Sequence, residues 1–332
     1  MKSNEYIFIG GHRKAGTTML LNLLDSHPDL LVYPIDLTIF YAYYPIYLAD
    51  SFTYDQKLYR LDRVVFDNFK AKLLKHPKII FDLDKMRSFF FDNMNNDKLN
   101  DMFFLTNLLV KAYCHAANLN FDDYSKIVLK ETSIEIYSEL LMDEFENIKI
   151  IELLRDPRDN YAALKAGSEK YYSKNGESKD LMLLSMIHRL RVSKKISNLW
   201  KRNNTSRISN VKFENLTTRK EETLEKLANF LEINFSERML VPTFMGQSTD
   251  GNSWNGLKLK EVSSVNVNNW KNRINDYEAQ IIEFHLEDIM RMHDYKLFYD
   301  DFDRVGASME FYKWANYNLF FKDSFKDKNN DD

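Results

Sequence analysis

The fold of this chain is decided by the stretch Tyr6-Ile7-Phe8-Ile9-Gly10-Gly11-His12-Arg13-Lys14-Ala15-Gly16-Thr17-Thr18, which leads into Met19-Leu20-Leu21-Asn22-Leu23-Leu24. Its apolar start predicts a short buried strand, its glycine-rich middle a turn, and its apolar end a helix. A strand, a glycine loop and a helix in this order form a phosphate cradle from backbone N–H groups and a helix N-terminus. We therefore expect a phosphate-binding loop at the start of the chain.

The position of the lysine separates this loop from those of nucleotide-hydrolysing P-loop proteins, whose pattern is G-x-x-x-x-G-K-[ST]. Gly11 and Gly16 have the required spacing, but Thr17 stands where the lysine belongs, and Lys14 lies inside the loop. Lys14 there can neutralise the oxygen of a leaving phosphate, while the backbone and the Thr17 and Thr18 hydroxyls donate hydrogen bonds. A tight connection with incidental glycines is the weaker explanation, because the loop also carries two basic residues and ends in two threonines.

The composition excludes several classes of function. The chain has 332 residues, of which 44% are hydrophobic, and its formal net charge is -3. That charge gives no general attraction to nucleic acid, so an anionic ligand needs a local basic site. A single cysteine, Cys114, excludes an internal disulfide framework and a multi-cysteine zinc site. No apolar run is long enough for a membrane span, and residues 1–5 leave no room for a signal peptide. We expect a cytoplasmic protein.

Continuous apolar runs alternate with helical patterns along the chain, which favours an α/β fold with a central parallel sheet between helical layers. Further strands are expected at 30–33, closed by Pro34, and at 127–129, 148–154 and 211–213. Helices are expected at 17–25, within 61–125, from 157 through 165, and at 181–202, 221–231 and 276–293. We expect one domain over residues 1–300 with a helical insertion at about 37–125. A C-terminal extension at 301–321 and a disordered tail at 322–332 would follow.

Polar clusters follow three of the later strands, where open parallel sheets bind their ligands. They are Lys130-Glu131-Thr132, Arg155-Asp156-Pro157-Arg158-Asp159 and Glu214-Asn215-Leu216. An arginine at position 155 offers a bidentate fork suited to phosphate, and Pro157 begins a helix whose N-terminus also favours an anion. For Arg158 we favour a surface ion-pair network with the neighbouring aspartates.

Together these segments resemble the sulfotransferases that use 3′-phosphoadenylyl sulfate (PAPS). Lys14-Ala15-Gly16-Thr17-Thr18 is similar to the family's 5′-phosphosulfate loop, and Leu24-Asp25-Ser26-His27-Pro28-Asp29 to its continuation. The segment that starts at Arg155 resembles the family's 3′-phosphate segment. Residues 211–216 and Val267-Asn268-Asn269-Trp270-Lys271 resemble two later family elements. The resemblance covers most of residues 6–293 and implies a P-loop-like three-layer sulfotransferase fold.

The chain departs from the family pattern at two places. Ala163 stands where a serine normally helps to hold the 3′-phosphate, which removes a hydrogen bond or two. Ser168, Lys165 or a residue of the 251–270 loop is expected to compensate. Asn268 and Asn269 replace the Gly-Arg pair before Trp270, so the nucleotide-covering loop matches loosely.

The resemblance implies transfer of a sulfuryl group from PAPS to a hydroxyl or amine of an acceptor, with adenosine 3′,5′-bisphosphate as product and no metal. Positioning and charge stabilisation dominate such in-line transfers. Lys14 would stabilise the leaving phosphate oxygen. The nucleotide would be bound by Arg13, Lys14, Ala15, Gly16, Thr17, Thr18, Arg155, Ala163, Trp270 and Lys271.

The acceptor must lose a proton, so a general base is expected. Asp36 is the candidate, because it is the only carboxylate shortly after the second strand. An N-cap for the segment 37–44 explains Asp36 equally well. His12, inside the phosphate loop, and Glu131, beside Lys130, are the alternative bases.

We expect a small-molecule or glycan acceptor, which includes a carbohydrate or glycolipid. The sequence leaves open whether it is a carbohydrate, a lipid headgroup, a peptide tyrosine or a small metabolite, and it leaves the oligomeric state open. Two other functions stay open at this point. A P-loop small-molecule kinase would need a lysine at position 17 and Mg²⁺, and Thr17 speaks against it. A non-catalytic nucleotide-binding protein of the same fold is favoured by Ala163 and by the uncertain base.

Overall fold

The computed structural model describes residues 4–42, 51–168, 179–204, 206–249, 251–252, 258–259 and 262–318. The chain forms two compact units, the first from Met1–Leu154 and Ile196–Ser263, the second from Arg155–Lys195 and Ser264–Asp332. In the ranges described, no helix combines the length and the apolar character that crossing a membrane requires. The expected tail at 322–332 lies outside those ranges, and the single domain over residues 1–300 stays a prediction.

A parallel five-stranded sheet in the order β2-β3-β1-β4-β5 forms the centre of the first unit. The strands are β1 (Glu5–Gly10), β2 (Leu30–Asp36), β3 (Lys126–Lys130), β4 (Ile148–Leu154) and β5 (Ile208–Lys212). Tyr6 of β1 lies opposite Ile127 of β3 and Ile148 of β4. The central strand therefore leads directly into the glycine loop, and the expected α/β fold class is confirmed.

Strand β2 differs from the expectation that Pro34 closes it, because it continues to Asp36. The strand lies at an edge of the sheet, and its register with β3 shifts between Val32 and Asp36. Proline is tolerated at a sheet edge or an irregular position, since no ladder hydrogen bond is lost there. The extension places Asp36 at the carboxyl end of β2, opposite Lys130 at the carboxyl end of β3.

The two faces of the sheet bury separate hydrophobic clusters, because alternate side chains along each strand point to opposite faces. Ile7 and Ile9 join the cluster that contains Leu20 and Leu21 of α1 (Thr17–Leu24). Leu227 of α10 (Lys220–Leu231) belongs to the same cluster. Helices therefore cover this face of the sheet, beside the glycine loop.

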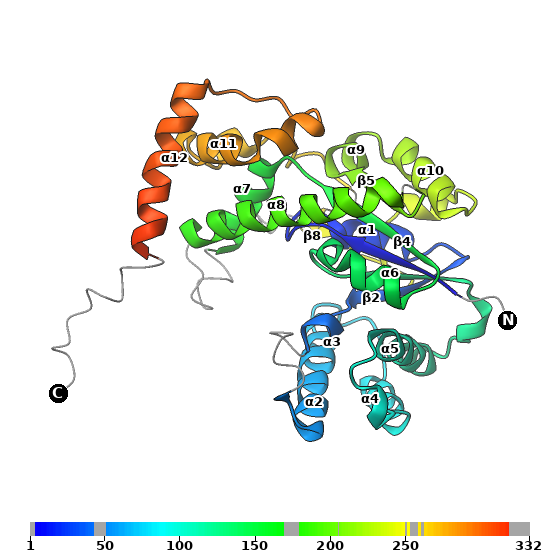
Figure 1. Ribbon diagram of the computed structural model, residues 1–332. Helices are drawn as coiled ribbons and strands as arrows, with labels where there is room; N and C mark the ends of the chain where they lie inside the picture. The colour runs from blue at the N-terminus through cyan, green and yellow to red at the C-terminus, as the bar shows by residue number, and fades with distance from the viewer. Residues whose placement is uncertain are drawn as a thin grey trace. The chain divides into compact units, whose positions relative to one another are not determined.

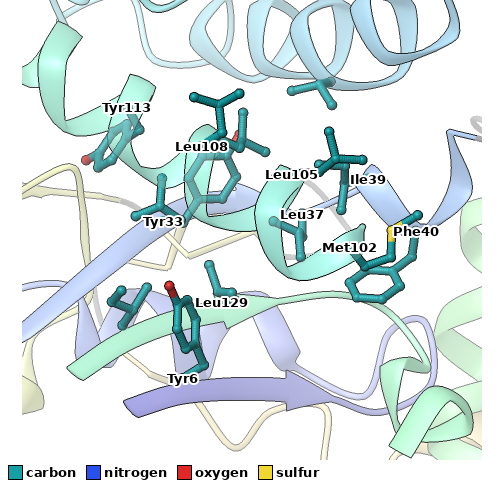
Figure 2. Packing of buried hydrophobic residues seen from close by; sticks show 14 of the residues in the cluster. Tyr6, Tyr33, Leu37, Ile39, Phe40, Met102, Leu105, Leu108, Tyr113 and Leu129 are labelled. Atoms are coloured by element: carbon teal, nitrogen blue, oxygen red, sulfur yellow. The ribbon is translucent and has the colours of Figure 1, made fainter. Parts of the chain in front are cut away.

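The opposite face packs against α5 (Met102–Ala117), the longest helix described in the expected insertion. Figure 2 shows Leu105 and Leu108 of this helix with Leu37 and Tyr33 of the β2 end of the sheet. The neighbouring helices are α2 (Tyr54–Leu61), a π-helical turn at Asp62–Phe66, α3 (Asp67–Leu73) and α4 (Leu83–Asp92), which group with α5 in Figure 1. One core thus joins the insertion to the sheet.

The remaining elements of the first unit are short. They include α6 (Ser138–Glu144), α9 (Phe213–Thr218) and two strand pairs, β6 (Thr243–Phe244) with β7 (Gln247–Ser248) and β8 (Gly251–Asn252) with β9 (Lys258–Leu259). The second of these pairs lies within the loop expected at 251–270. Helix α8 (Lys179–Asn203) contributes residues to both units.

The second unit is helical and has its own core. Tyr161 and Leu164 of α7 (Pro157–Gly167) pack with Ile281 and Ile282 of α11 (Asp276–Met292). Phe311 of α12 (Asp301–Asn316) completes this core, and α11 and α12 lie side by side in Figure 1. The C-terminal extension, for which no structure was expected, is thus helical over these residues.

Candidate functional site

The loop after β1 requires both of its spaced glycines. Gly16 has φ +104°, and a Cβ built there would lie 2.5 Å from Cδ2 of Phe213. Gly11 has φ +131°, and its Cβ would lie 2.5 Å from the carbonyl oxygen of Leu153. Both positions combine left-handed backbone with close packing, which only glycine accepts without strain. The glycines are therefore structural requirements of the turn.

The loop turns back on itself before helix α1 begins. The N–H of Ala15 donates to the carbonyl oxygen of His12 at 3.0 Å, and Lys14 has a left-handed backbone with φ 67°. Gly16 is the N-cap of α1, and the helix starts at Thr17. The Lys14 side chain is exposed, whereas Thr17 is buried. The loop therefore brings an exposed ammonium group beside a helix N-terminus, an arrangement that favours an anion.

Glu135 anchors the start of the loop, a role that the sequence gave no signal for. Its side chain is buried, and its Oε2 accepts the N–H of Gly11 at 2.8 Å. A Cβ at Gly10 would clash with the same oxygen, so Gly10 makes room for the carboxylate. A distant acidic residue thus sets the path of the chain into the phosphate loop.

Asp36 forms an ion pair with Lys130 at the carboxyl edge of β2 and β3. The Lys130 ammonium group is buried and also lies 3.4 Å from Oγ1 of Thr18. Burial acts to raise the pKa of Asp36, but the charges of Lys130 and Lys72 hold it below its ordinary value. Asp36 is therefore an ionised carboxylate that Lys130 links to the phosphate loop. Its side chain caps no helix, since the short helical turn after it begins behind Thr38.

Glu131 lies in the same cluster but is almost fully buried. Its two oxygens accept the N–H of Thr38 at 2.6 Å and the N–H of Thr132 at 2.7 Å. Burial and the charge of Asp36 raise its pKa to about 7, although Lys130 and these hydrogen bonds act in the opposite direction. The carboxyl group therefore ties the segment after β2 to the end of β3 and changes charge near neutral pH.

His12, the other alternative base, is buried within the loop. Its Nδ1–H donates to the carbonyl oxygen of Arg13 at 3.1 Å. This contact orients the imidazole along the loop backbone.

Lys72 of α3 is a basic residue of this cluster that sequence reasoning missed. Burial lowers its pKa, attraction to Asp36 raises it, and the charges of Lys130, Lys75 and Lys14 lower it further. The Lys72 ammonium group therefore interacts electrostatically with both Asp36 and Lys14. The insertion thus contributes a charged group to the edge of the sheet where the phosphate loop lies.

The residues expected to bind the 3′-phosphate, Arg155 and the position of Ala163, lie in the second unit. Arg155 directly precedes the N-cap of α7, and its Nη2 donates to the carbonyl oxygen of Asn266 at 3.0 Å. Ala163 is buried within α7. In the same unit, Asp159 of α7 accepts the N–H of Asn268 at 2.6 Å, so the segment before Trp270 is tied to this helix.

Arg158 is part of an ion-pair network, as expected, but the expectation that the network lies at the surface is wrong. The Arg158 side chain is 1% exposed and bonds Asp156 at 2.6 Å and Glu283 at 2.5 Å. The guanidinium carbon also lies 4.5 Å from the centre of the Trp270 ring. Arg158 therefore ties the start of α7 to α11 and Trp270 inside the second unit.

Trp270 is buried in the core of the second unit, next to the ring of Phe298. Lys271 is exposed, and its ammonium group lies 3.9 Å from the centre of the Phe298 ring. Packing accounts for both residues, and their contact with a nucleotide stays a prediction.

Sequence reasoning thus identified residues in both units. In the first unit, the structure brings Lys14, Thr18, Asp36 and Glu131 to the carboxyl edge of the sheet. Lys130, which the sequence placed in a polar cluster after a strand, is the last residue of β3 and pairs with Asp36. The structure adds Lys72, for which we find no signal in the sequence. Within the described ranges, no three His, Cys, Asp or Glu side chains lie close enough together to hold a metal ion.

The solved structures that share the fold include two sulfotransferase domains. The sulfotransferase domain from the Synechococcus PCC 7002 olefin synthase is 18% identical, with a TM-score of 0.54 over 90% of this chain and 97% of that domain. The sulfotransferase domain from the curacin biosynthetic pathway is 16% identical, with a TM-score of 0.55 over 90% of this chain and all of that domain. No curated protein sequence matches this chain significantly.

The sequence profile of the sulfotransferase family matches residues 6–237, which is more than half of the chain. The matched range contains the glycine loop, the Asp36–Lys130 pair and Arg155. It confirms the family that the motifs suggested. The chain belongs to the sulfotransferase family and is a sulfotransferase enzyme.

Proposed function

We propose that this enzyme uses PAPS as the sulfuryl donor and transfers the group in line, without a metal, to a hydroxyl or amine of a small-molecule or glycan acceptor. The observation that carries the proposal is the cluster at the carboxyl edge of β1, β2 and β3. There the phosphate loop, an exposed lysine, a buried lysine and an ionised carboxylate lie together.

The loop fits the 5′-phosphosulfate group of the donor. Gly11 and Gly16 leave no side chain over the turn, and the N-terminus of α1 follows directly. Backbone N–H groups there and the Thr18 hydroxyl provide donors, while Lys14 supplies a positive charge. When bound, PAPS supplies an activated sulfuryl group whose leaving oxygen belongs to a phosphate. The role of Lys14 is to stabilise the charge that develops on that oxygen.

Asp36 is the proposed general base. Its carboxylate is one-fifth exposed, whereas Glu131 is buried and both its oxygens already accept backbone N–H groups. Lys130 lowers the basicity of Asp36 in the structure described. An anion beside Thr18 would share the charge of Lys130, and the carboxylate would then become a better proton acceptor. Lys130 therefore couples the donor side of the site to the acceptor side.

The nucleotide half of the proposal places the 3′-phosphate at Arg155. The guanidinium group is held by the carbonyl of Asn266 next to the N-terminus of α7, where an anion is favoured. Lysine and arginine carry the same charge, but only the planar guanidinium group of arginine can donate two parallel hydrogen bonds to a phosphate.

Calorimetric titration with adenosine 3′,5′-bisphosphate in the presence of EDTA tests the proposal. We expect binding in the micromolar range, which corresponds to about -8 kcal/mol. Release of that nucleotide from PAPS should then depend on an added acceptor, screened among alcohols, amines and sugars. Absence of binding without metal would contradict the choice of donor. Binding without turnover on any acceptor would favour a non-catalytic nucleotide-binding protein.

A further inference from the structure

A second arginine of the second unit, Arg273, contacts the helix α7 that Arg155 precedes. The Nη2 of Arg273 donates to the carbonyl oxygen of Ala162 at 2.7 Å. Ala162 precedes Ala163, the position where the family pattern has a hydroxyl that this chain lacks. The guanidinium group of Arg273 is thus anchored to the turn of α7 that carries the missing hydroxyl.

The backbone holds Arg273 in this position. The N–H of Arg273 donates to the carbonyl oxygen of Trp270 at 2.9 Å, and Trp270 is buried in the core of the unit. A few residues earlier, the N–H of Asn268 donates to Asp159 of α7 at 2.6 Å. The segment is therefore attached to α7 at two points, one on each side of Trp270.

Arg273 and Arg155 influence each other electrostatically. Burial and the charge of Arg155 together lower the pKa of Arg273 to about 10, although the charge of Asp159 acts to raise it. Two guanidinium groups that repel each other in a half-buried setting cost free energy. An anion between them would recover that cost, and a phosphate monoester carries two negative charges.

We propose that Arg273 binds the 3′-phosphate of the nucleotide together with Arg155 and replaces the hydroxyl missing at Ala163. The assignment rests on the proposed use of a 3′-phosphorylated donor. An arginine compensates well for a lost hydroxyl, because charge-assisted hydrogen bonds to phosphate are about twice as strong as neutral ones. Arg273 then determines specificity, since it distinguishes nucleotides that carry a 3′-phosphate from those that do not.

A structural role for Arg273 is the competing explanation, because its contact with Ala162 alone would stabilise the packing of α7. The two roles differ in what they predict for ligands. Loss of a packing contact weakens the binding of every nucleotide equally. Loss of a phosphate ligand weakens only the binding of nucleotides that carry the 3′-phosphate.

The test is calorimetry with adenosine 3′,5′-bisphosphate and adenosine 5′-phosphate on the wild-type protein and on Arg273→Gln. We expect the preference for the bisphosphate to fall about tenfold or more in the variant, with the affinity for the monophosphate unchanged. Arg273→Lys keeps the charge without the fork and should retain part of the preference. Arg191→Gln is the matched control, because Arg191 also donates to a backbone carbonyl in the second unit, that of His285.

Each outcome decides a separate question. Equal losses for both nucleotides in Arg273→Gln, or an unchanged preference, would overturn the role of Arg273 while leaving the donor intact. If the wild-type protein bound both nucleotides equally, the 3′-phosphorylated donor itself would be wrong, and the role of Arg273 with it. Thermal unfolding of each variant identifies any general loss of structure. If Arg273→Gln does not fold, the affinities for the two nucleotides are compared in Arg273→Lys instead.

Discussion

Lys14 is the residue on which the proposed transfer depends most directly. Its left-handed backbone directs the chain back toward α1, and its side chain is exposed at the start of that helix. An ammonium group placed where charge develops in the transition state accelerates the reaction more than it strengthens ground-state binding. The kinetic effect of its removal should therefore exceed the effect on affinity.

For Lys14→Ala, we expect kcat to fall about a hundredfold or more, while the affinity for adenosine 3′,5′-bisphosphate falls less than about tenfold. Assays of nucleotide release measure kcat, and calorimetry measures the affinity for adenosine 3′,5′-bisphosphate. Lys226→Ala, which removes an exposed lysine paired with Glu222 in α10, should change neither. A Lys14→Ala enzyme with a wild-type rate would show that another group stabilises the leaving oxygen.

The backbone conformation of the loop depends on Gly16, and Gly16→Ala should distort the loop. The added methyl group would meet the Phe213 ring, and alanine is strained at φ +104°. We expect a loss of about 1–3 kcal/mol in the free energy of unfolding and a large loss of nucleotide affinity. Gly246→Ala is an informative control, because φ is +73° there but no atom lies within 4 Å of the new methyl group. Equal effects of both changes on nucleotide binding would contradict the steric argument.

The pH dependence of the rate distinguishes the candidate bases. The pKa of Asp36 is held below its ordinary value, so a rate that depends on ionised Asp36 stays level from about pH 6 to 8. The pKa of Glu131 is about 7, so dependence on ionised Glu131 would make the rate rise across that range.

We expect kcat/KM for the acceptor to be level, and Asp36→Asn to lower it about a hundredfold or more. Glu131→Gln should retain most of the activity. A rate that rises through pH 7 and disappears in Glu131→Gln would transfer the role of the base to Glu131.

At the scale of elements, Arg158 joins α7 to α11. Its guanidinium group is bonded to Asp156 at the N-cap of α7 and to Glu283 within α11, and Glu283 also accepts the N–H of Phe298 at 3.0 Å. The network is buried, so its members depend on one another for their hydrogen bonds. It holds the helix whose start carries Arg155.

Arg158→Met should therefore destabilise the protein by about 3–5 kcal/mol, because two carboxylates would stay buried without their cation. Urea unfolding measures the change. Arg291→Met removes an exposed pair four residues apart with Glu287 and should cost less than about 1 kcal/mol. Comparable losses for the two variants would mean that the buried network contributes no more than a surface pair.

At the scale of the whole molecule, the buried carboxyl group of Glu131 links stability to pH. Its folded pKa of about 7 lies above the ordinary value of 4.5. The folded state therefore holds this proton more tightly than the unfolded state does. The stability that results is fully present below the unfolded pKa and is lost as the pH rises through 7.

We expect the wild-type free energy of unfolding to fall, relative to that of Glu131→Gln, by on the order of 2 kcal/mol between pH 5 and 8. Asp36 contributes in the opposite sense, since its lowered pKa adds stability that is lost only in acid. Asp36 is present in both proteins, so the difference between them reports Glu131 together with its interaction with Asp36. A difference that does not change with pH would contradict the raised pKa.

Local signals predicted much of the fold. The strand at 148–154 has the expected bounds, and the helices at 17–24 and 220–231 differ from expectation by a residue. Apolar runs and glycines determine such elements within a few residues of sequence. Two features were missed for a physical reason. Pro34 is tolerated in β2 because that strand lies at the sheet edge, and α12 becomes a helix of the second unit because it packs on α11.

The sequence by itself determined the phosphate loop, the parallel sheet and the family, because these depend on short patterns with their own backbone requirements. Only the tertiary structure decided the partners of the site. Asp36 and Lys130 form an ion pair although 94 positions separate them in the sequence. Glu135 accepts the N–H of Gly11 from 124 positions away, and Arg273 donates to Ala162 from 111 positions away. Side chains so far apart in the chain come together only when the sheet and the helical core form, and no local pattern specifies which of them will meet.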